Sequence, residues 1–297
     1  MSAPHPSHAP FDAAVFSGGG CHCIWQAGFW STAAPLLDLR PDVIAAVSGG
    51  AAFACAALSG EAERVIADFK RRVQANRRNV YWTNALRSAP VFPHEAIYRG
   101  VIADHLSEDG LRRVHEGPDL RILLARPPAW LGTRSGVLTA ALAHLLDRRE
   151  QRPRPRWSRR AGFQAELVSA RSCRTPAELV ELILQSSCIP LLFPVCRRGG
   201  RITLDGSLLD NTPVRAVDSA SSVLVLLSHR VPDARIPSIP GHTYVQPSRE
   251  LPIARWDYTS PGLAQETFDL GRWDGERFAR TQSAAAPAPT RTISAAS

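Results

Sequence analysis

A serine between small residues is the first feature of this sequence that could do chemistry. In Ala46-Val47-Ser48-Gly49-Gly50 the serine follows an apolar run and precedes the small, apolar stretch 51–58. The small residues at positions 46 and 50 let a strand and a helix pass closely, so the Ser48 hydroxyl would project over the edge of a sheet. Taken alone, such a serine is more often a structural turn or a helix cap.

Two further segments could assist a nucleophile. Gly18-Gly19-Gly20 lies between the apolar run 12–16 and a helical pattern, where bare N–H groups can bind developing negative charge. The dinucleotide-binding spacing fails because Cys23 occupies the third glycine position. Asp205 ends the apolar run 201–204 and precedes Gly206, which favours a sharp turn with the carboxylate in a cleft. An Asp-Gly hairpin turn is the alternative.

The elements that must position these groups follow from short apolar runs and helical periodicity. Strands are predicted at 12–16, 42–47, 120–125, 163–169, 201–204 and 223–228, with helices at 61–78, 133–149, 176–186 and 262–280. Strands that alternate with helices predict a mostly parallel sheet covered on both faces. Each of the three motifs follows a predicted strand directly, at the end where open parallel sheets place their sites.

Together these motifs resemble the patatin-like phospholipases. That family has a Gly-rich oxyanion loop near its N-terminus, a G-x-S-x-G elbow on the next strand and a later Asp-Gly-[Gly/Ala]. The corresponding residues here are Gly18-Gly19-Gly20, Ala46-Val47-Ser48-Gly49-Gly50 and Asp205-Gly206-Ser207. The run from Ser186 through Pro194 and the segment Asn211-x-Pro213 also fit, so the resemblance covers roughly residues 12–280.

The resemblance implies a three-layer α/β/α fold with a mostly parallel central sheet. It also implies a lipid acyl hydrolase that cleaves carboxylic esters of phospholipids or related lipids. Ser48 would be the nucleophile and Asp205 its only side-chain base, without a histidine. The amides of Gly18, Gly19 and Gly20 would form the oxyanion hole, and Gly49, Gly50 and Gly206 would support the turns. The resemblance requires no metal and no organic cofactor.

Four positions depart from the family pattern. His22 lies where the family usually has Lys or Arg, and Cys23 lies where it often has Gly. Ala46 replaces the first glycine of the elbow, and Ser207 replaces a Gly or Ala. Because Ala and Ser are the smallest alternatives to Gly, we expect these two changes to be tolerated.

Two other interpretations remain open. An α/β-hydrolase triad would use Ser48, Asp205 and His229 in the right chain order, although the elbow follows the first strand too soon for that fold. A catalytically decayed lipid-binding protein would explain Ala46 and Cys23. The intact serine, aspartate and three consecutive glycines argue against this interpretation.

Composition limits the remaining choices. The chain has 297 residues and a formal net charge of +8, and Lys70 is its only lysine, which together with abundant Ala and Pro indicates a GC-rich bacterial genome. The run 148–160 holds seven Arg and one Glu, so we expect a solvated loop that contacts anionic membrane surfaces. No nucleic-acid partner is expected, because the run lacks a reading motif.

The ends of the chain carry no motif residue. We expect a disordered leader at 1–10, a single catalytic domain at 11–280 and a disordered, low-complexity tail at 281–297. The first ten residues lack the basic and apolar regions of a secretory signal, which favours a cytoplasmic protein, peripheral at the membrane, with reduced cysteines.

Overall fold

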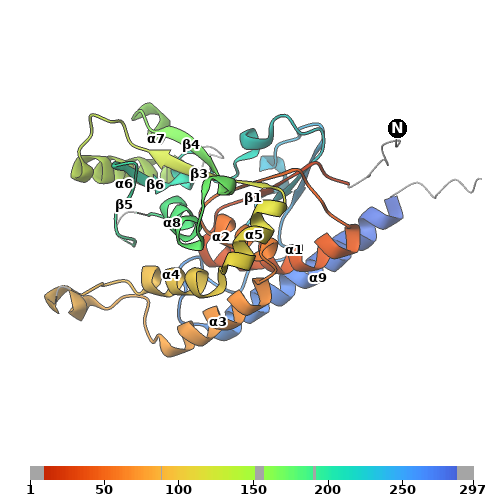
Figure 1. The fold of residues 1–297 in the computed structure, drawn as a ribbon, viewed down its shortest axis with the longest axis horizontal. Helices are drawn as coiled ribbons and strands as arrows, with labels where there is room; N and C mark the ends of the chain where they lie inside the picture. Colours follow the sequence, from red (N-terminus) through yellow and green to blue (C-terminus); the bar gives the residue numbers. More distant parts are fainter. Residues whose placement is uncertain (1–9, 88, 151–156, 190–191, 286–297) are drawn as a thin grey trace, which may run out of the picture.

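The computed structural model describes residues 10–285, except for 88, 151–156 and 190–191, and shows helices packed around one sheet (Figure 1). The strands are β1 Ala13–Phe16, β2 Val43–Ala46, β3 Asp119–Arg126, β4 Gln164–Ser169, β5 Cys196–Arg198, β6 Arg201–Asp205, β7 Val223–Leu226 and β8 His242–Val245. The α-helices are α1 Ile24–Leu37, α2 Gly49–Leu58, α3 Ala62–Ala75, α4 His94–His105, α5 Glu108–Glu116, α6 Thr133–Glu150, α7 Trp157–Arg160, α8 Pro176–Ser186 and α9 Pro261–Ala285.

The sheet has the strand order β5-β6-β3-β2-β1-β7-β8, and β4 pairs with β3 off this path. The pairs β3–β2, β2–β1, β1–β7 and β7–β8 are parallel, whereas β4 and β6 both run antiparallel to β3. Strands β1, β2 and β7 are buried along their whole length, as expected for parallel strands covered on both faces. The predicted mostly parallel sheet is therefore confirmed.

Helices cover both faces of this sheet and give three layers. On one face the apolar side chains of α1, α2, α5 and α8 pack against alternate residues of β1, β2 and β3, including Phe16 and Ile122. On the other face Val214 and Val217, from the 3₁₀ turn Val214–Val217, pack against β1 and β7. Ala140 of α6 closes this face near the end of β3. The three-layer α/β/α architecture is thus confirmed.

The last helix, α9, lies along α1, and the two run side by side in Figure 1. Their backbones approach so closely that a Cβ atom on Gly28 would lie 2.1 Å from the Phe268 carbonyl oxygen. Trp25 Nε1 donates a 2.8 Å hydrogen bond to Asp274 Oδ2 across the same interface. This packing fixes α1, whose N-terminal end follows the glycine loop directly.

Several boundaries differ from the sequence-based ones. All six predicted strands are present, but β5, β8, α4 and α5 were not predicted. Helix α9 continues through Ala285 because Gln282, Ala284 and Ala285 still favour a helix ahead of Pro287. The run 148–160 is not wholly a solvated loop, since Trp157–Arg160 is helical and Ser158 is fully buried. Residues 1–9 of the predicted leader 1–10 and residues 286–297 of the predicted tail 281–297 lie outside the described residues.

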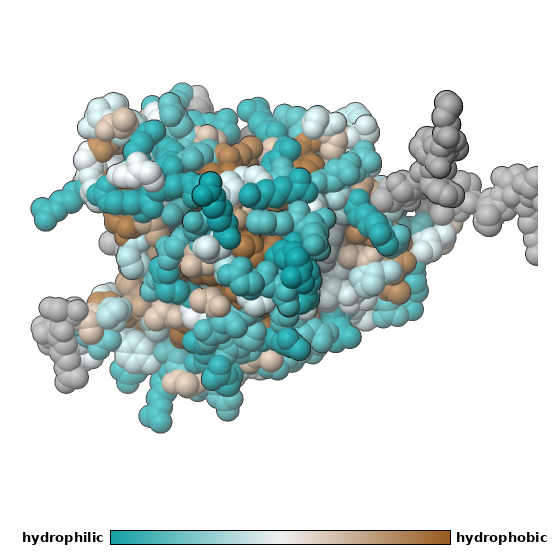
Figure 2. All heavy atoms as spheres, in the orientation of Figure 1, coloured by the Kyte–Doolittle hydropathy of each residue, from teal (hydrophilic) through white to brown (hydrophobic). Residues whose placement is uncertain are grey.

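In the space-filling view most of the visible surface is hydrophilic, with small brown apolar areas between teal side chains (Figure 2). Within the described part of the chain, no helix combines the length and apolar character that crossing a bilayer requires.

Candidate active site

The three motifs meet at one end of the sheet, and strand β3 sets their spacing. Ala46, the last residue of β2, lies opposite Ile122 of β3, whereas Asp205, the last residue of β6, lies opposite Leu124. Leu124 is two residues beyond Ile122, and Ser48 is two residues beyond Ala46. Asp205 therefore lies across β3 from Ser48.

Ser48 has the backbone conformation of a nucleophile elbow. Its φ of 54° and ψ of −133° are strained for a residue with a side chain. Its N–H donates to Ser186 Oγ at 2.9 Å, and Ser186 Oγ donates to the Leu123 carbonyl at 2.8 Å, so the turn is tied to β3. A Cβ on Gly50 would lie 2.6 Å from the Ser17 carbonyl oxygen, so the close passage requires glycine there.

The side chains of Ser48 and Asp205 are bonded to each other. Ser48 Oγ donates to Asp205 Oδ2 at 2.7 Å, and the N–H of Ser207 donates to Asp205 Oδ1 at 2.8 Å. Ser48 occupies the N-cap position of α2, but its hydroxyl makes no capping bond. Both side chains are buried, with relative exposures of 4% and 1%. The Ser48 hydroxyl therefore bonds to a carboxylate instead of capping α2, and the Asp205-Gly206 turn holds that carboxylate beside the serine.

Burial is the main influence on the Asp205 carboxylate and raises its pKa above the ordinary value. The hydrogen bonds from Ser48 and Ser207 and the positive charge of Arg255 act in the opposite direction. Because its pKa is raised, the Asp205 carboxylate accepts a proton more readily than a surface aspartate does.

The glycine loop presents its amides unequally. The N–H of Gly18 already donates to the Asn211 carbonyl at 3.0 Å. The N–H groups of Gly19 and Gly20 make no hydrogen bond to any residue that the structure describes. Gly20 has a φ of 57°, and its backbone lies against Gly49, since a Cβ on Gly49 would be 3.2 Å from Gly20 N. The amides of Gly19 and Gly20 thus remain available next to the elbow.

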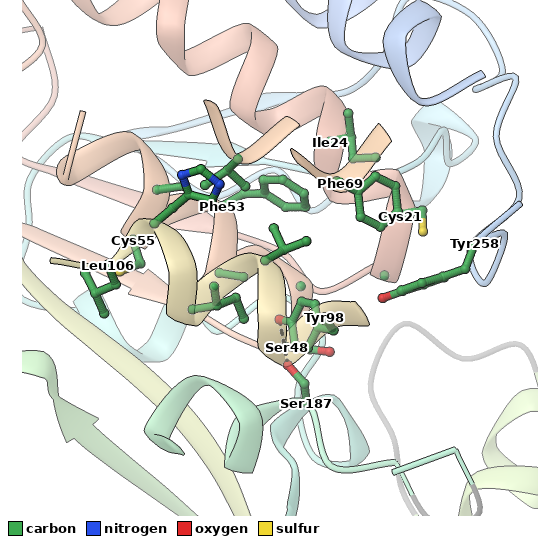
Figure 3. Close-up of a pocket in the computed structure, with 18 of the residues that line it drawn as sticks. Cys21, Ile24, Ser48, Phe53, Cys55, Phe69, Tyr98, Leu106, Ser187 and Tyr258 are labelled. Carbon is green, nitrogen blue, oxygen red and sulfur yellow. Dashed lines mark hydrogen bonds between the residues drawn. The ribbon is translucent and has the colours of Figure 1, made fainter. Parts of the chain in front are cut away.

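An apolar pocket lies beside Ser48, with a volume of about 740 Å³ when the open solvent at its mouth is included. Figure 3 shows Ser48 with Tyr98 and Ser187 close by at the lower centre, Leu106 and Cys55 to the left, and Cys21 and Tyr258 to the right. Tyr98 and Ser187 are joined by a 3.0 Å hydrogen bond between their hydroxyls. Most of the wall is apolar and comes from helices α2, α3 and α4.

The segment 253–258, which follows β8, covers the glycine loop and was missed by sequence reasoning. The carbonyl of Arg255 accepts the N–H of Cys21 at 2.9 Å, and a Cβ on Gly20 would lie 3.1 Å from Arg255 Cγ. Trp256 and Tyr258 from the same segment line the pocket. No periodicity or motif marks this segment in the sequence, because the contacts that place it over the glycine loop are with distant residues.

Neither nearby histidine hydrogen-bonds to Ser48 or Asp205. The Nδ1 atom of His229 pairs with Ser228 Oγ at 3.3 Å, and the Nδ1 atom of His22 is buried with no hydrogen-bond partner among the described residues. Burial, followed by the Arg255 charge, lowers the pKa of His22 to about 4 and also lowers the pKa of His229. A lowered pKa favours the neutral form of the His22 ring, and burial is the main cause.

The cysteines of the Cys21-His22-Cys23 cluster act as hydrogen-bond donors. Cys21 Sγ donates to the Asp257 carbonyl at 3.3 Å and Cys23 Sγ to the Ser17 carbonyl at 3.4 Å. Burial raises the pKa of both thiols, which keeps them protonated. Across the described residues, no three His, Cys, Asp or Glu side chains are grouped so that they could hold a metal ion.

The family model described as patatin-like phospholipase matches residues 14–218, which is more than half of the chain. Among solved structures the chain is similar to the crystal structure of VipD from Legionella pneumophila, with 12% identity, a TM-score of 0.44, and coverage of 94% of this chain and 68% of that one. No match was found among curated proteins. The chain belongs to the patatin-like phospholipase family.

Proposed function

We propose that this protein hydrolyses carboxylic esters of phospholipids or related lipids, with Ser48 as the nucleophile and Asp205 as its base. Membership of the family supports lipid acyl hydrolysis in general. The observation that carries the residue assignment is the 2.7 Å hydrogen bond to a buried carboxylate from Ser48 Oγ, which lines an apolar pocket.

The proposed reaction has two halves. As Ser48 Oγ attacks the ester carbonyl, its proton passes to Asp205 Oδ2, and the carboxylic acid then protonates the departing alcohol. Water subsequently attacks the acyl-enzyme, again with Asp205 as the base. Burial favours this role because a raised pKa makes the carboxylate a better proton acceptor.

The oxyanion that forms in each half needs donors on the other side of the carbonyl. We assign this role to the amides of Gly19 and Gly20, because the Gly18 amide is bonded to Asn211. Gly18 is then a positioning residue, whose carbonyl accepts hydrogen bonds from Asn211 Nδ2 at 3.0 Å and Ser228 Oγ at 2.6 Å. One such donor is commonly worth about 3–4 kcal/mol of transition-state stabilisation.

The hydrogen bonds of the histidines favour this dyad over a triad. In a triad the imidazole must lie between the serine and the carboxylate, but Asp205 Oδ2 accepts directly from Ser48. His229 is turned to Ser228 instead.

The substrate class follows from the pocket. Its wall offers apolar side chains from Ile24, Phe53 and Phe69 to a long acyl chain. The hydroxyl groups in its lining belong to Ser48, Ser59, Tyr98, Ser187 and Tyr258. A panel of carboxylic esters and phospholipids tests the proposal. We expect turnover of medium- or long-chain esters to exceed that of acetyl esters, and no turnover of any ester would instead favour a decayed lipid-binding protein.

We expect Arg255 to influence the pH at which activity is lost on the acid side of the pH–rate profile. Its charge favours the ionised form of Asp205, so Arg255→Gln should raise the pKa of that carboxyl further. Since Asp205 must be ionised to accept a proton, the activity of the variant should be lost at a higher pH than that of the wild type.

The measurement is kcat/KM against pH for a neutral, water-soluble ester. Arg249→Gln is the matched control, because Arg249 lies in the same region of the chain but pairs with Glu266 at the surface. If the acid limb of Arg255→Gln coincides with that of the wild type, Arg255 does not influence the pKa of Asp205.

The predicted contact between the Arg-rich run 148–160 and acidic lipid remains a proposal. Residues 151–156, and the side chains of 147–150, lie outside the described part of the chain.

A further inference from the structure

Helix α6 exposes three leucines and buries two alanines. Ala140 packs in the core that contains Phe163 and Leu204, and Ala143 is also buried. Leu138, Leu142 and Leu145 are 70%, 56% and 50% exposed. An amphipathic helix on a globular protein normally shows the opposite arrangement.

The exposed leucines form one continuous row. Their spacing of i, i+4 and i+7 places them on the same face of the helix. Trp130, which is 81% exposed, precedes the helix by one short turn. We call Trp130, Leu138, Leu142 and Leu145 the leucine face. Four of the nine large apolar side chains that are exposed in the described part of the chain belong to it, so these side chains are concentrated there.

The surroundings of the leucine face are strongly cationic. The sequence from 127 to 160 contains eight Arg and only two acidic residues, Asp147 and Glu150. Among the described side chains, Arg134 is exposed on α6, and Arg159 and Arg160 are exposed on the neighbouring helix α7. Arg160 also lies over the ring of Trp157, at 5.3 Å from its centroid. An apolar row bordered by arginine is typical of helices that lie in the interface of anionic membranes.

The leucine face is also joined to the wall of the pocket. Phe193 lines the pocket, and Val195, two residues later, is 38% exposed. In the following strand β5, Arg197 Nη2 donates at 2.6 Å to Oγ1 of Thr133, the first residue of α6. Figure 1 shows α6, α7 and β5 together at the upper left, away from the α1–α9 pair. A surface that touches α6 would therefore be linked through β5 to Phe193 in the wall of the proposed acyl pocket.

We propose that the leucine face docks the protein on anionic phospholipid surfaces, with Leu138, Leu142 and Leu145 inserted among the acyl chains and the flanking arginines at the phosphates. The proposal rests on the proposed function only for its choice of a lipid partner. The positive flank favours a lipid surface over a second copy of this chain, which would bring two cationic faces together.

The test is co-sedimentation of the full chain with phosphatidylglycerol-rich vesicles at low and high salt. The variant L138Q/L142Q/L145Q keeps residues that favour a helix and changes only exposed side chains. We expect it to bind at least about tenfold more weakly than the wild type, because it loses the apolar contact. Leu36→Gln is the matched control, since Leu36 is 57% exposed on α1, and it should bind like the wild type.

Activity separates this proposal from the proposed function. The triple variant should hydrolyse a water-soluble ester at the wild-type rate but a vesicle lipid much more slowly. Ser48→Ala should still bind vesicles, because docking does not need catalysis. Equal vesicle binding by the wild type and the triple variant would overturn the proposal. So would the absence of binding by the wild type, or a wild-type dimer that the triple substitution converts to a monomer.

Discussion

Replacing Ser48 with alanine is expected to reduce ester hydrolysis by at least about a thousand-fold. The substitution removes the only atom that attacks the carbonyl in the proposed mechanism, while the backbone turn and the pocket remain. The fold and the thermal midpoint should change little, because the serine side chain makes no capping bond to α2. Initial rates on a neutral ester and circular dichroism measure the two effects.

Ser59→Ala is the matched control for this substitution. Ser59 lines the same pocket and is equally buried, but its hydroxyl bonds to the Ala56 carbonyl at 3.1 Å rather than to a carboxylate. Its variant should keep nearly full activity. Substantial turnover by Ser48→Ala would exclude Ser48 as the nucleophile.

Replacing Asp205 with asparagine is expected to have an effect of similar size. Asparagine fills the same space but cannot take up the proton of Ser48, so both halves of the reaction lose their base. His229→Ala and His22→Ala should each retain activity within about a few-fold of the wild type, since neither ring bonds to the dyad.

The kcat of all three variants on one soluble ester decides between a dyad and a triad. A loss of several orders of magnitude in His229→Ala would favour the triad, even if Asp205→Asn is also inactive. Activity in Asp205→Asn close to that of the wild type would contradict both arrangements.

Local chemistry explains why the sequence was sufficient for part of this site. A serine in a strand-to-helix turn, three adjacent glycines and an Asp-Gly pair each need particular residues at particular positions, and such needs are visible without a structure. The buried strands β1, β2 and β7 were predicted for a similar reason, because a strand covered on both faces is apolar throughout.

The direction of the strand that carries Asp205 was not predictable in the same way. The motif order led us to expect the carboxylate at the end of a parallel strand, but β6 is antiparallel to β3. A short apolar run contains no information about its direction, and the position of Asp205 depends on its pairing with Leu124.

Two other features depend on tertiary contacts alone. Segment 253–258 is held by hydrogen bonds to the glycine loop and has no pattern of its own. Helix α6 was predicted from its periodicity, but that pattern would have buried the leucines. The structure buries Ala140 and Ala143 instead, and large side chains at those positions would not fit so close to the core.

Helix α5, in contrast, could have been recognised from the sequence, because it begins after Ser107, whose hydroxyl accepts the N–H of Gly110.

The central claim is that Ser48 is the nucleophile of a buried serine–aspartate pair. Its most direct test is to treat the wild-type protein with a fluorophosphonate probe and to identify the labelled residue by peptide mass spectrometry. We expect a single label on Ser48, with no label in Ser48→Ala and strongly reduced labelling in Asp205→Asn. A label on any other serine, or equal labelling of the wild type and Ser48→Ala, would contradict the central claim.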